Sequence, residues 1–323
     1  MNKSIKKEAL QIDGFLLANK TRGLTSMDVV RKVKSLTGME RRVGHGGTLD
    51  PLAEGVLPIC FGQATRLMDL LINEPKEYQM DVLLGESTDT YDAEGKIVYQ
   101  GDPSGVSRQQ IEEELQKFQG MFWQEPPMHS ALKRGGKRLY ELARQGLEVE
   151  REPRQVWIYE IKVLDFRMPV VTISTVCGRG MYMRSLANDL GAALKCGGHT
   201  SSLTRRRIGP FQLENTVNMD EFAIAVNEGR WREMIKPPDS LFLNLRSVTL
   251  SMPAERDLRN GQSVPLANHA IRGGHLEKHR LYSSDGRFIG IGRLDRSRNQ
   301  WDSHKLLMLK APSPHAPNSG PDS

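Results

Sequence analysis

The feature of the sequence that most constrains the fold is a set of long segments in which apolar and polar residues alternate. In residues 77–85, EYQMDVLLG, the apolar positions recur at every second residue and are Tyr78, Met80, Val82 and Leu84. A period of two is typical of a β-strand that buries one face. Residues 155–166 and 169–177 are two further long strand-like segments. The sequence therefore predicts a large sheet with one face against a core.

Helical segments are interspersed with these strands. Residues 26–37 carry apolar residues at every third position, with Ser26 as the expected cap and Gly38 as the expected end. Ser107 and Gln110 form a capping box at the start of another helix. Further helices are expected at residues 64–74 and 182–198. Because the elements follow no strict βαβ repeat, the predicted fold class is α+β, around one large, mixed but mainly antiparallel sheet.

Changes in composition divide the chain into predicted units. Residues 126–152 are rich in Lys, Arg and Gly, and we expect them to leave the core as a basic excursion. A Pro-Pro linker precedes a run of short strand-like pieces with glycine turns. The predicted units are an N-terminal arm at 1–11, a large domain at 12–242, a small β-rich domain at 246–311 and a disordered tail at 312–323.

Charge and cysteine usage narrow the class of protein. A net charge of +6 and a pI near 9.2 are compatible with a polyanionic partner. No apolar run approaches the ~18 residues of a membrane span, and the basic N-terminal residues lack the apolar core of a secretory signal. The three cysteines, Cys60, Cys177 and Cys196, form no CxxC pair, so neither a disulfide framework nor a zinc site is indicated. A cytoplasmic location is expected.

One glycine-rich stretch, GHGGTLDPLAEGVLP at residues 44–58, raises a question about chemistry. No Lys-Ser or Lys-Thr follows the glycines, so the stretch is not a P-loop. Asp50 stands where the glycines give way to an apolar run. From these residues alone, Asp50 is either the first residue of an Asp-Pro turn or a nucleophile held near a core.

Five ordered blocks of the sequence resemble a known family. The stretch RRVGHGGTLDPLAEGVLPICFGQATR closely resembles the signature of the TruB family of tRNA pseudouridine synthases. Similar blocks follow or precede it in the family's order: KTRGLTS, EYQMDVLLGESTDTYDAEG, PPMHSALKRGGKRLYELARQG and GRGMYMRSLANDLG. The C-terminal segment resembles the PUA domain of bacterial members. The resemblance covers nearly all of residues 12–310, and implies a pseudouridine synthase catalytic domain followed by a PUA-like domain.

The resemblance implies an activity and a partner. It implies isomerisation of uridine to pseudouridine in the T-loop of tRNA, at the position numbered 55 by tRNA convention. The substrate is then tRNA, through its T-stem-loop and also its acceptor stem. The resemblance implies no metal, nucleotide or organic cofactor, no membrane and no obligatory protein partner. We expect a monomer.

The resemblance also implies roles for individual residues. Asp50 aligns with the nucleophile and Arg184 with the arginine that pairs with it. Tyr78 aligns with a residue that stacks on the extruded uracil or takes part in proton transfer. The other substrate-contacting positions are His45, Tyr182 and Leu203, and Asp92 lies in a block near the active site with a supporting hydrogen-bond role.

Three of these residues also have an ordinary structural interpretation. Tyr78 fits a core tyrosine of an alternating strand, and Leu203 fits a core leucine. His45, flanked by glycines, fits a loop histidine bonded to a neighbouring carbonyl, or a ring that occupies the space vacated by the flipped base.

Two basic stretches are predicted to contact RNA. The excursion carries Lys133, Arg134 and Lys137 with Arg138 and Tyr140, a mixture that suits an RNA-gripping loop. The run RRR at residues 205–207 is the second. In both cases the alternative is a solvated surface, which is what most charge runs form.

Three functions remain open at this level. The first is the stand-alone tRNA-modifying enzyme. The second is a non-catalytic RNA-binding or RNA-folding protein on the same fold, which the joint presence of Asp50, Tyr78 and Arg184 disfavours as the sole function. The third is a guide-RNA-dependent synthase that works within a multi-protein particle.

Overall fold

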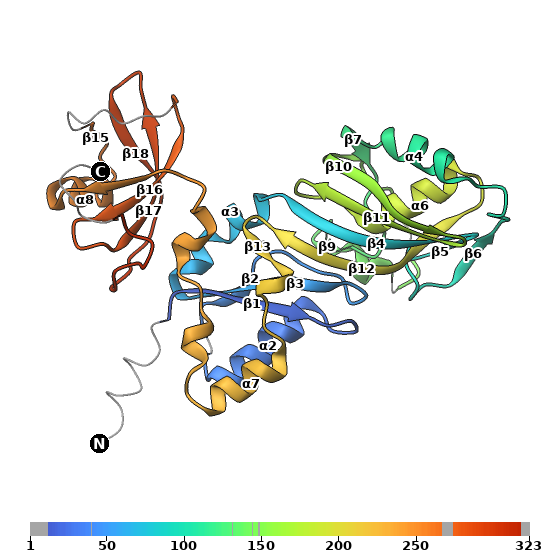
Figure 1. Cartoon of the computed structure of the whole chain (residues 1–323), viewed down its shortest axis with the longest axis horizontal. Helices are drawn as coiled ribbons and strands as arrows, with labels where there is room; N and C mark the ends of the chain where they lie inside the picture. Colours follow the sequence, from blue (N-terminus) through green and yellow to red (C-terminus); the bar gives the residue numbers. More distant parts are fainter. Residues whose placement is uncertain are drawn as a thin grey trace.

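The computed structural model describes residues 12–39, 41–130, 132–143, 145–147, 149–266 and 274–317. In this described part, nine strands form one large sheet. The strands along the sheet are β1 (Gly14–Lys20), β3 (Glu54–Phe61), β12 (Gly198–Ile208), β4 (Lys76–Leu84), β11 (Val170–Cys177), β10 (Arg154–Arg167) and β7 (Gly120–Gln124). Two short strands attach to it, β2 (Val43–His45) to β3 and β13 (Phe211–Gln212) to β12. Figure 1 shows the sheet running through the larger domain.

The sheet is mixed but mainly antiparallel. Within it, β12 and β3 pair in parallel, whereas the other strand pairs of this sheet, in the described part of the chain, are antiparallel. The three segments expected as long strands are confirmed as β4, β11 and β10. In β4, Tyr78, Met80, Val82 and Leu84 face the core, as their alternation predicts. The predicted α+β class is therefore confirmed.

Four helices cover one face of the sheet. They are α2 (Ser26–Thr37), α4 (Arg108–Gln116), α6 (Met183–Ala193) and α7 (Met219–Asn227). In Figure 1, α2 and α7 lie together beneath β1, while α4 and α6 lie together at the β10–β11 half. Apolar side chains of all four helices, among them Val29 of α2 and Leu186 of α6, belong to the same buried core as the sheet.

The helix ends show which local signals were correct. Gly38 ends α2 in the left-handed conformation, and Ser107 with Gln110 forms the capping box of α4, both as predicted. The expected cap Ser26 is wrong by one residue, because Thr25 caps α2 together with Asp28. Ser26 is instead buried, and its hydroxyl bonds the backbone of Leu49, which is distant in the sequence.

Short helices and small sheets complete the large domain. The helix expected at residues 64–74 is a 3-10 turn, η1 (Gly62–Leu67), followed by α3 (Met68–Asn73). The remaining elements are the pair β5 (Glu86–Thr88) and β6 (Ile97–Gln100), the pair β8 (Lys133–Arg134) and β9 (Lys137–Arg138), α5 (Leu139–Ala143), η2 (Leu213–Asn215) and η3 (Trp231–Met234).

In its described residues, the small domain is a five-stranded sheet with one helix, α8 (Met252–Arg259). Its strands, in order across the sheet, are β14 (Ser247–Leu250), β16 (Lys278–Ser283), β17 (Phe288–Asp295), β18 (Gln300–Leu306) and β15 (Val264–Pro265). It follows η4 (Pro238–Phe242) and stands at one end of the large domain in Figure 1.

The two domains share an apolar cluster. Phe15 and Val56, on the face of β1 and β3 that α2 and α7 leave open, belong to the same buried cluster as Phe288 and Ile291 of β17. Beside it, the hydroxyl of Tyr282 donates to the buried carboxylate of Asp239 at 2.7 Å. The junction is therefore a packed interior and not a flexible linker.

The tail differs from its prediction. Disorder was expected from residue 312, but residues 312–317 lie against the small domain. The Ser313 hydroxyl donates to Asp239, and Ala316 packs against the cluster shared by the domains. A Pro/Ser-rich segment usually has too few apolar side chains to pack against a domain. Here the hydrogen bond from Ser313 to the buried Asp239 carboxylate holds the segment in place.

The close packing of α6 on β12 gives a stability prediction. A Cβ at Gly191 would lie 2.1 Å from the backbone nitrogen of Gly198. Replacing glycine by alanine in a helix normally stabilises it by about 0.5–1 kcal/mol. We expect Gly191→Ala to destabilise the protein instead, by about 2 kcal/mol, because α6 must move off the sheet.

The measurement is urea denaturation. The exposed neighbour Ala192 provides the control, since Ala192→Gly should cost about 1 kcal/mol from helix propensity alone. A Gly191→Ala protein as stable as the wild type would contradict the packing.

Candidate active site

Asp50 lies in the loop that joins β2 to β3. A Cβ at Gly46 would lie 2.1 Å from Cδ2 of Leu71, so this tight start of the loop needs glycine. Leu49 and Leu52 are buried on either side of Asp50 and anchor the loop in the core. The Asp50 side chain nevertheless keeps 34 % of its surface exposed. The loop thus holds a carboxylate at the edge of the core with one side open.

Two side chains from distant segments fix the backbone next to Asp50. The Ser26 hydroxyl donates to the Leu49 carbonyl at 3.0 Å and accepts from the Leu49 N–H at 2.8 Å. Lys20, at the end of β1, donates from Nζ to the Pro51 carbonyl at 3.2 Å. Burial lowers the pKa of Lys20 to about 8, although the nearby Asp50 charge acts to raise it. The residues before and after Asp50 are therefore both held.

Arg184, on α6, joins Asp50 to two other segments. Its Nε donates to Oδ2 of Asp50 at 2.9 Å, and its Nη1 donates to Oδ2 of Asp92 at 3.1 Å. The remaining bonds go to the carbonyls of Thr90, at 3.0 Å, and His129, at 2.8 Å. The side chain is 4 % exposed. A buried guanidinium with this many acceptors is compensated, and its planar fork orients the Asp50 carboxylate.

Asp92 is the buried member of this group. It lies in the loop between β5 and β6, and its Oδ1 accepts from the Thr90 hydroxyl at 2.6 Å and from the Glu94 N–H at 3.1 Å. Its Oδ2 binds Arg184, so both oxygens have partners. Asp92 is therefore fully hydrogen-bonded and holds Arg184, while Asp50 keeps one side of its carboxylate open.

Tyr78 and Leu203 come from two adjacent strands of the same sheet. In the register of the sheet, Tyr78 of β4 is opposite Thr175 of β11 and Arg205 of β12. Burial raises the pKa of Tyr78; the Arg205 charge opposes this effect, and the Asp50 charge adds to it. Leu203 is buried in the same core cluster as Tyr78. Both side chains are thus packed in the core, and the Asp50 charge also acts on the pKa of Tyr78.

Tyr182 stands at the start of α6, two residues before Arg184. The side-chain amide of Gln124 donates to the Tyr182 carbonyl at 3.0 Å and accepts from the Tyr182 N–H at 2.8 Å. This buried pair of bonds ties the end of β7 to the start of α6. Burial raises the pKa of Tyr182, and the Asp50 charge adds to the effect. Tyr182 therefore also lies near Asp50.

His45 ends β2, just before the glycines of the loop. Its buried Nδ1 has no hydrogen-bond partner among the described residues. Burial lowers the pKa of His45, and the Arg205 charge lowers it further, so the ring is neutral at pH 7. The interpretation as a loop histidine bonded through this nitrogen to a carbonyl is not observed.

The excursion is a β-hairpin with a short helix. Its backbone forms β8, a Gly135–Gly136 turn, β9 and α5, with Lys133 paired to Arg138 and Arg134 to Lys137. The side chains of Lys133, Arg134 and Lys137 lie outside the described part of the structure, as do those of Arg138 and Tyr140. The hairpin starts a few residues after His129, whose carbonyl binds Arg184.

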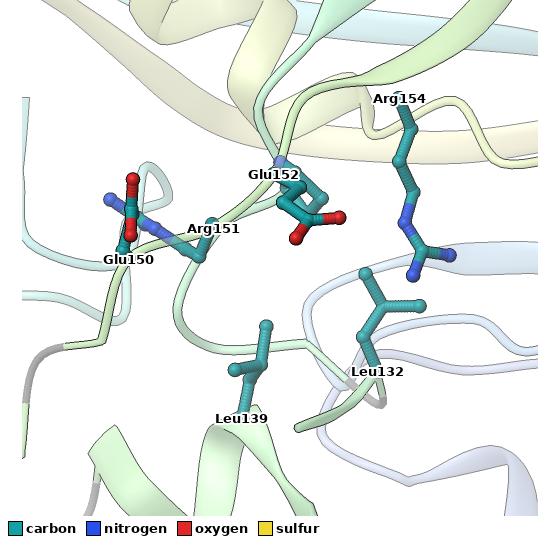
Figure 2. A pocket seen from close by; sticks show the side chains of 7 residues that line it. Leu132, Leu139, Glu150, Arg151, Glu152 and Arg154 are labelled. Atoms are coloured by element: carbon teal, nitrogen blue, oxygen red, sulfur yellow. The ribbon is translucent and has the colours of Figure 1, made fainter. Parts of the chain in front are cut away.

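A cavity of about 130 Å³ lies at the base of the excursion. Figure 2 shows Leu132 and Leu139 on one side of it and charged residues on the other. Its lining residues are Pro126, Leu132, Leu139, Glu150, Arg151, Glu152 and Arg154. The Arg154 charge acts to lower the pKa of Tyr182, so the cavity adjoins the site.

The run of three arginines corrects one expectation. Arg205 is 1 % exposed, so the prediction that it contacts RNA is wrong. Arg207 is partly buried and pairs with Glu77 at 3.1 Å, and Arg206 pairs with Glu214 on the surface at 2.7 Å. On a strand, successive side chains point to opposite faces, and here the alternation buries the first arginine and exposes the second.

Comparison with known proteins identifies the family. Residues 34–183 match the model "TruB family pseudouridylate synthase (N terminal domain)", and residues 184–243 match "tRNA pseudouridylate synthase B C-terminal domain". Residues 247–298 match "Pseudouridine synthase II TruB, C-terminal". The protein "tRNA pseudouridine synthase B" of Dechloromonas aromatica is 42 % identical over 94 % of this chain and 98 % of its own length. The chain belongs to the TruB family of pseudouridylate synthases.

Other relatives agree with this assignment. The "tRNA pseudouridine synthase B" of Clostridium tetani is 38 % identical over 92 % of this chain and all of its own length. Among solved structures, a Cbf5-Nop10-Gar1 complex matches with a TM-score of 0.69 and 26 % identity, over 95 % of this chain and 88 % of the other. An H/ACA RNP bound to a substrate RNA containing 2'-deoxyuridine has the same TM-score at 23 % identity, over 97 % and 89 %, and shows a shared fold.

None of the described helices has the length and apolar character to cross a membrane. In the same part of the chain, no group of three or more His, Cys, Asp or Glu side chains is placed to hold one metal ion.

Three residues that hold this TruB site together escaped the sequence analysis. Ser26 was assigned as a cap, Arg205 was assigned to a charge run, and Gln124 was not singled out. All three act on backbone groups far away in the sequence. The available signal for Gln124 was a polar residue on the same strand face as Phe122, since such residues are buried only with partners. Arg205 had no such signal, because β12 also carries other polar residues, such as Ser201.

The different burial of the two carboxylates predicts different costs for neutralising them. Asp92→Asn should destabilise this TruB protein by about 3 kcal/mol, because it leaves the buried Arg184 charge without its buried partner. Asp50→Asn should change stability by no more than about 1 kcal/mol, because Asp50 is partly exposed.

Urea denaturation of the two variants beside the wild type measures this difference. Both changes preserve side-chain volume, so packing is matched. Equal losses in the free energy of unfolding of the two variants would contradict the prediction that the buried carboxylate matters more for stability.

Proposed function

We propose that this chain isomerises uridine to pseudouridine at position 55, in the T-loop of tRNA, with Asp50 as the nucleophile. The observation that carries the proposal is the Asp50 carboxylate, open on one side and oriented by Arg184 at 2.9 Å. The charge of Asp50 reaches Tyr78 and Tyr182, so the aromatic residues lie around it. The names of the relatives, "tRNA pseudouridine synthase B", support tRNA as the substrate class.

The reaction conserves every atom of the substrate. The bond from the ribose C1′ to N1 of uracil breaks, and N1 gains a proton. The base turns, C5 bonds to C1′, and the proton on C5 is lost. One proton enters and one leaves, so the product is an isomer and no electrons are exchanged.

Breaking an N-glycosidic bond develops positive charge on the sugar, as in glycoside hydrolysis. The Asp50 carboxylate has three ways to assist. It attacks C1′, it adds to C6 of the uracil, or it removes the 2′-proton to give a glycal. Each route needs the carboxylate oxygen at a fixed position, which is what the bond from Arg184 and the anchored loop provide.

The target base must leave its stack before Asp50 can reach the ribose. Flipping costs a few kcal/mol, and stacking on an aromatic ring returns ~1–3 kcal/mol per base. We assign this stacking to Tyr78, with Tyr182 and Leu203 as further walls of the pocket. Because burial raises its pKa, the Tyr78 phenol is protonated at neutral pH and can donate a hydrogen bond to the base. The neutral His45 ring is assigned to the space that the base leaves.

The excursion is assigned to tRNA binding. Its register places Lys133 opposite Arg138 and Arg134 opposite Lys137, so cations pair with cations across the hairpin. Like charges directly opposite each other are destabilising in a sheet. A phosphate backbone between them would relieve this repulsion, and a polyanion is therefore the partner that the pattern favours.

The first test is activity of the purified protein alone on an unmodified T-stem-loop RNA labelled with tritium at C5 of uridine. We expect tritium release by the wild type without any guide RNA. Asp50→Asn should bind the RNA and release no tritium, because an amide cannot replace the ionised oxygen.

The other outcomes identify the competing functions. Release only in the presence of a guide RNA would favour the guide-dependent synthase. RNA binding without release under either condition would favour an RNA-binding or RNA-folding protein. Turnover by the Asp50→Asn protein would remove Asp50 from its role.

The second test reverses the charges of the excursion. Changing Lys133, Arg134, Lys137 and Arg138 to Glu should weaken tRNA binding and flatten its salt dependence, because fewer counterions are then released. The matched control reverses four exposed cations of α4 and β10: Arg108, Lys117, Lys162 and Arg167.

Both variants carry the same change in net charge, so a general electrostatic effect would appear in both. The salt slope of the tRNA dissociation constant is the measurement. A slope that changes equally in the two variants, or in neither, would count against the excursion as the binding element.

A further inference from the structure

Arg205 is a buried cation beside the loop that carries Asp50. It lies on β12 and is 1 % exposed. In the described part of the chain, no carboxylate lies within ion-pair distance of its guanidinium. Burying a charge is costly unless it is well hydrogen-bonded. The position of this arginine therefore calls for a specific set of acceptors.

Those acceptors are backbone carbonyls at the start of the Asp50 loop and on the following strand. The Arg205 Nη2 donates to the Gly47 carbonyl at 3.0 Å, and Nη1 lies 3.5 Å from the Thr48 carbonyl oxygen. Nε donates to the Val56 carbonyl of β3 at 2.8 Å. One planar guanidinium thus connects the residues before Asp50 with the strand after it.

The backbone of Arg205 holds the other end of the same loop. In the parallel pairing of β12 with β3, Arg205 is the register partner of Gly55. Gly55 has a φ of +101°, and a Cβ there would lie 2.3 Å from the Arg205 carbonyl oxygen. Such close approach requires glycine. The first residue of the segment 47–55 therefore contacts the side chain of Arg205, and its last residue contacts the Arg205 main chain.

Arg205 complements the two other supports of the loop. Ser26 holds Leu49 and Lys20 holds Pro51, both from the segment around α2 and β1. Arg205 holds the loop from the sheet, and its register partner on the other side is Tyr78. The same residue is thus in contact with the strand of Tyr78 and with the loop of Asp50.

We propose that Arg205 is a positioning residue: its guanidinium fixes residues 47, 48 and 56, so that the Asp50 carboxylate meets both Arg184 and the ribose of the bound uridine. This inference rests on the proposed function. It assigns Arg205 to the rate of the chemical step and not to RNA affinity, because a side chain that is 1 % exposed has no access to phosphate.

The experiment compares Arg205→Lys, Arg205→Met and the surface control Arg167→Met, at an arginine of β10 whose side chain is 84 % exposed. Single-turnover tritium release gives the rate constant, and filter binding gives the tRNA dissociation constant and its salt slope. Lysine keeps the charge but loses the planar fork that binds several carbonyls at once. We expect Arg205→Lys to lower the rate constant by about 10- to 100-fold, because small misplacements of a reacting group cost about this much.

In both Arg205 variants the tRNA dissociation constant should stay within about twofold of the wild type and its salt slope should be unchanged, because no phosphate contact is lost. Arg205→Met should be slower than Arg205→Lys, since it keeps no donor for the carbonyls. Arg167→Met should retain the wild-type rate constant. Thermal unfolding midpoints of all proteins establish that they are folded.

The outcomes separate this inference from the proposed function. An inactive wild type would overturn the proposed function itself. With an active wild type, a folded Arg205→Lys protein at the wild-type rate overturns the positioning role. So does a loss of tRNA affinity with an unchanged rate constant. Failure of both Arg205 variants to fold would also overturn it, by showing that Arg205 is required for the fold and not for placement of the loop.

Discussion

The rest of the site depends on the position of one guanidinium. Arg184 comes from the first turn of α6, Asp50 from the loop before β3, Asp92 from the loop between β5 and β6, and His129 from the start of the excursion. Four segments that are far apart in the chain therefore meet at a single side chain. Because that side chain is buried, the charge of Arg184 is tolerated only with its buried carboxylate partner Asp92 in place. The fold and the site are thus coupled through the same ion pairs.

The sheet explains how these segments arrive together. The parallel contact of β12 with β3 brings the strand of Leu203 and Arg205 beside the strand that follows Asp50. On its other edge, β12 pairs with β4 and so places Tyr78 opposite Arg205. The residues assigned to the chemistry lie on or next to these three adjacent strands. Helix α6 packs on β12, and this contact brings Arg184 over the same place.

Patterns within one element were predictable from the sequence, and contacts between elements were not. The alternation in β4 and the glycine that ends α2 are properties of a few successive residues, and the structure has them where they were expected. Ser26 and Arg205 were misassigned for the opposite reason. Their partners, Leu49 and Gly47, are distant in the sequence, so a capping pattern and a charge run were the nearest local explanations. The pairing of Asp50 with Arg184 came from the family resemblance, since no local pattern links residues 134 positions apart.

The apolar cluster between the domains has a consequence for how the molecule evolves and unfolds. Val56 lies on β3, which follows the Asp50 loop, and Phe15 lies on β1, which pairs with β3; Phe288 and Ile291 belong to the same buried cluster. Removing the small domain would expose this apolar face to water on the strands that support Asp50. The small domain therefore covers an apolar face of the large domain, in addition to having a sheet of its own. The two domains should melt as one cooperative body, and shuffling the small domain between proteins would require its inner surface to be matched to a new host.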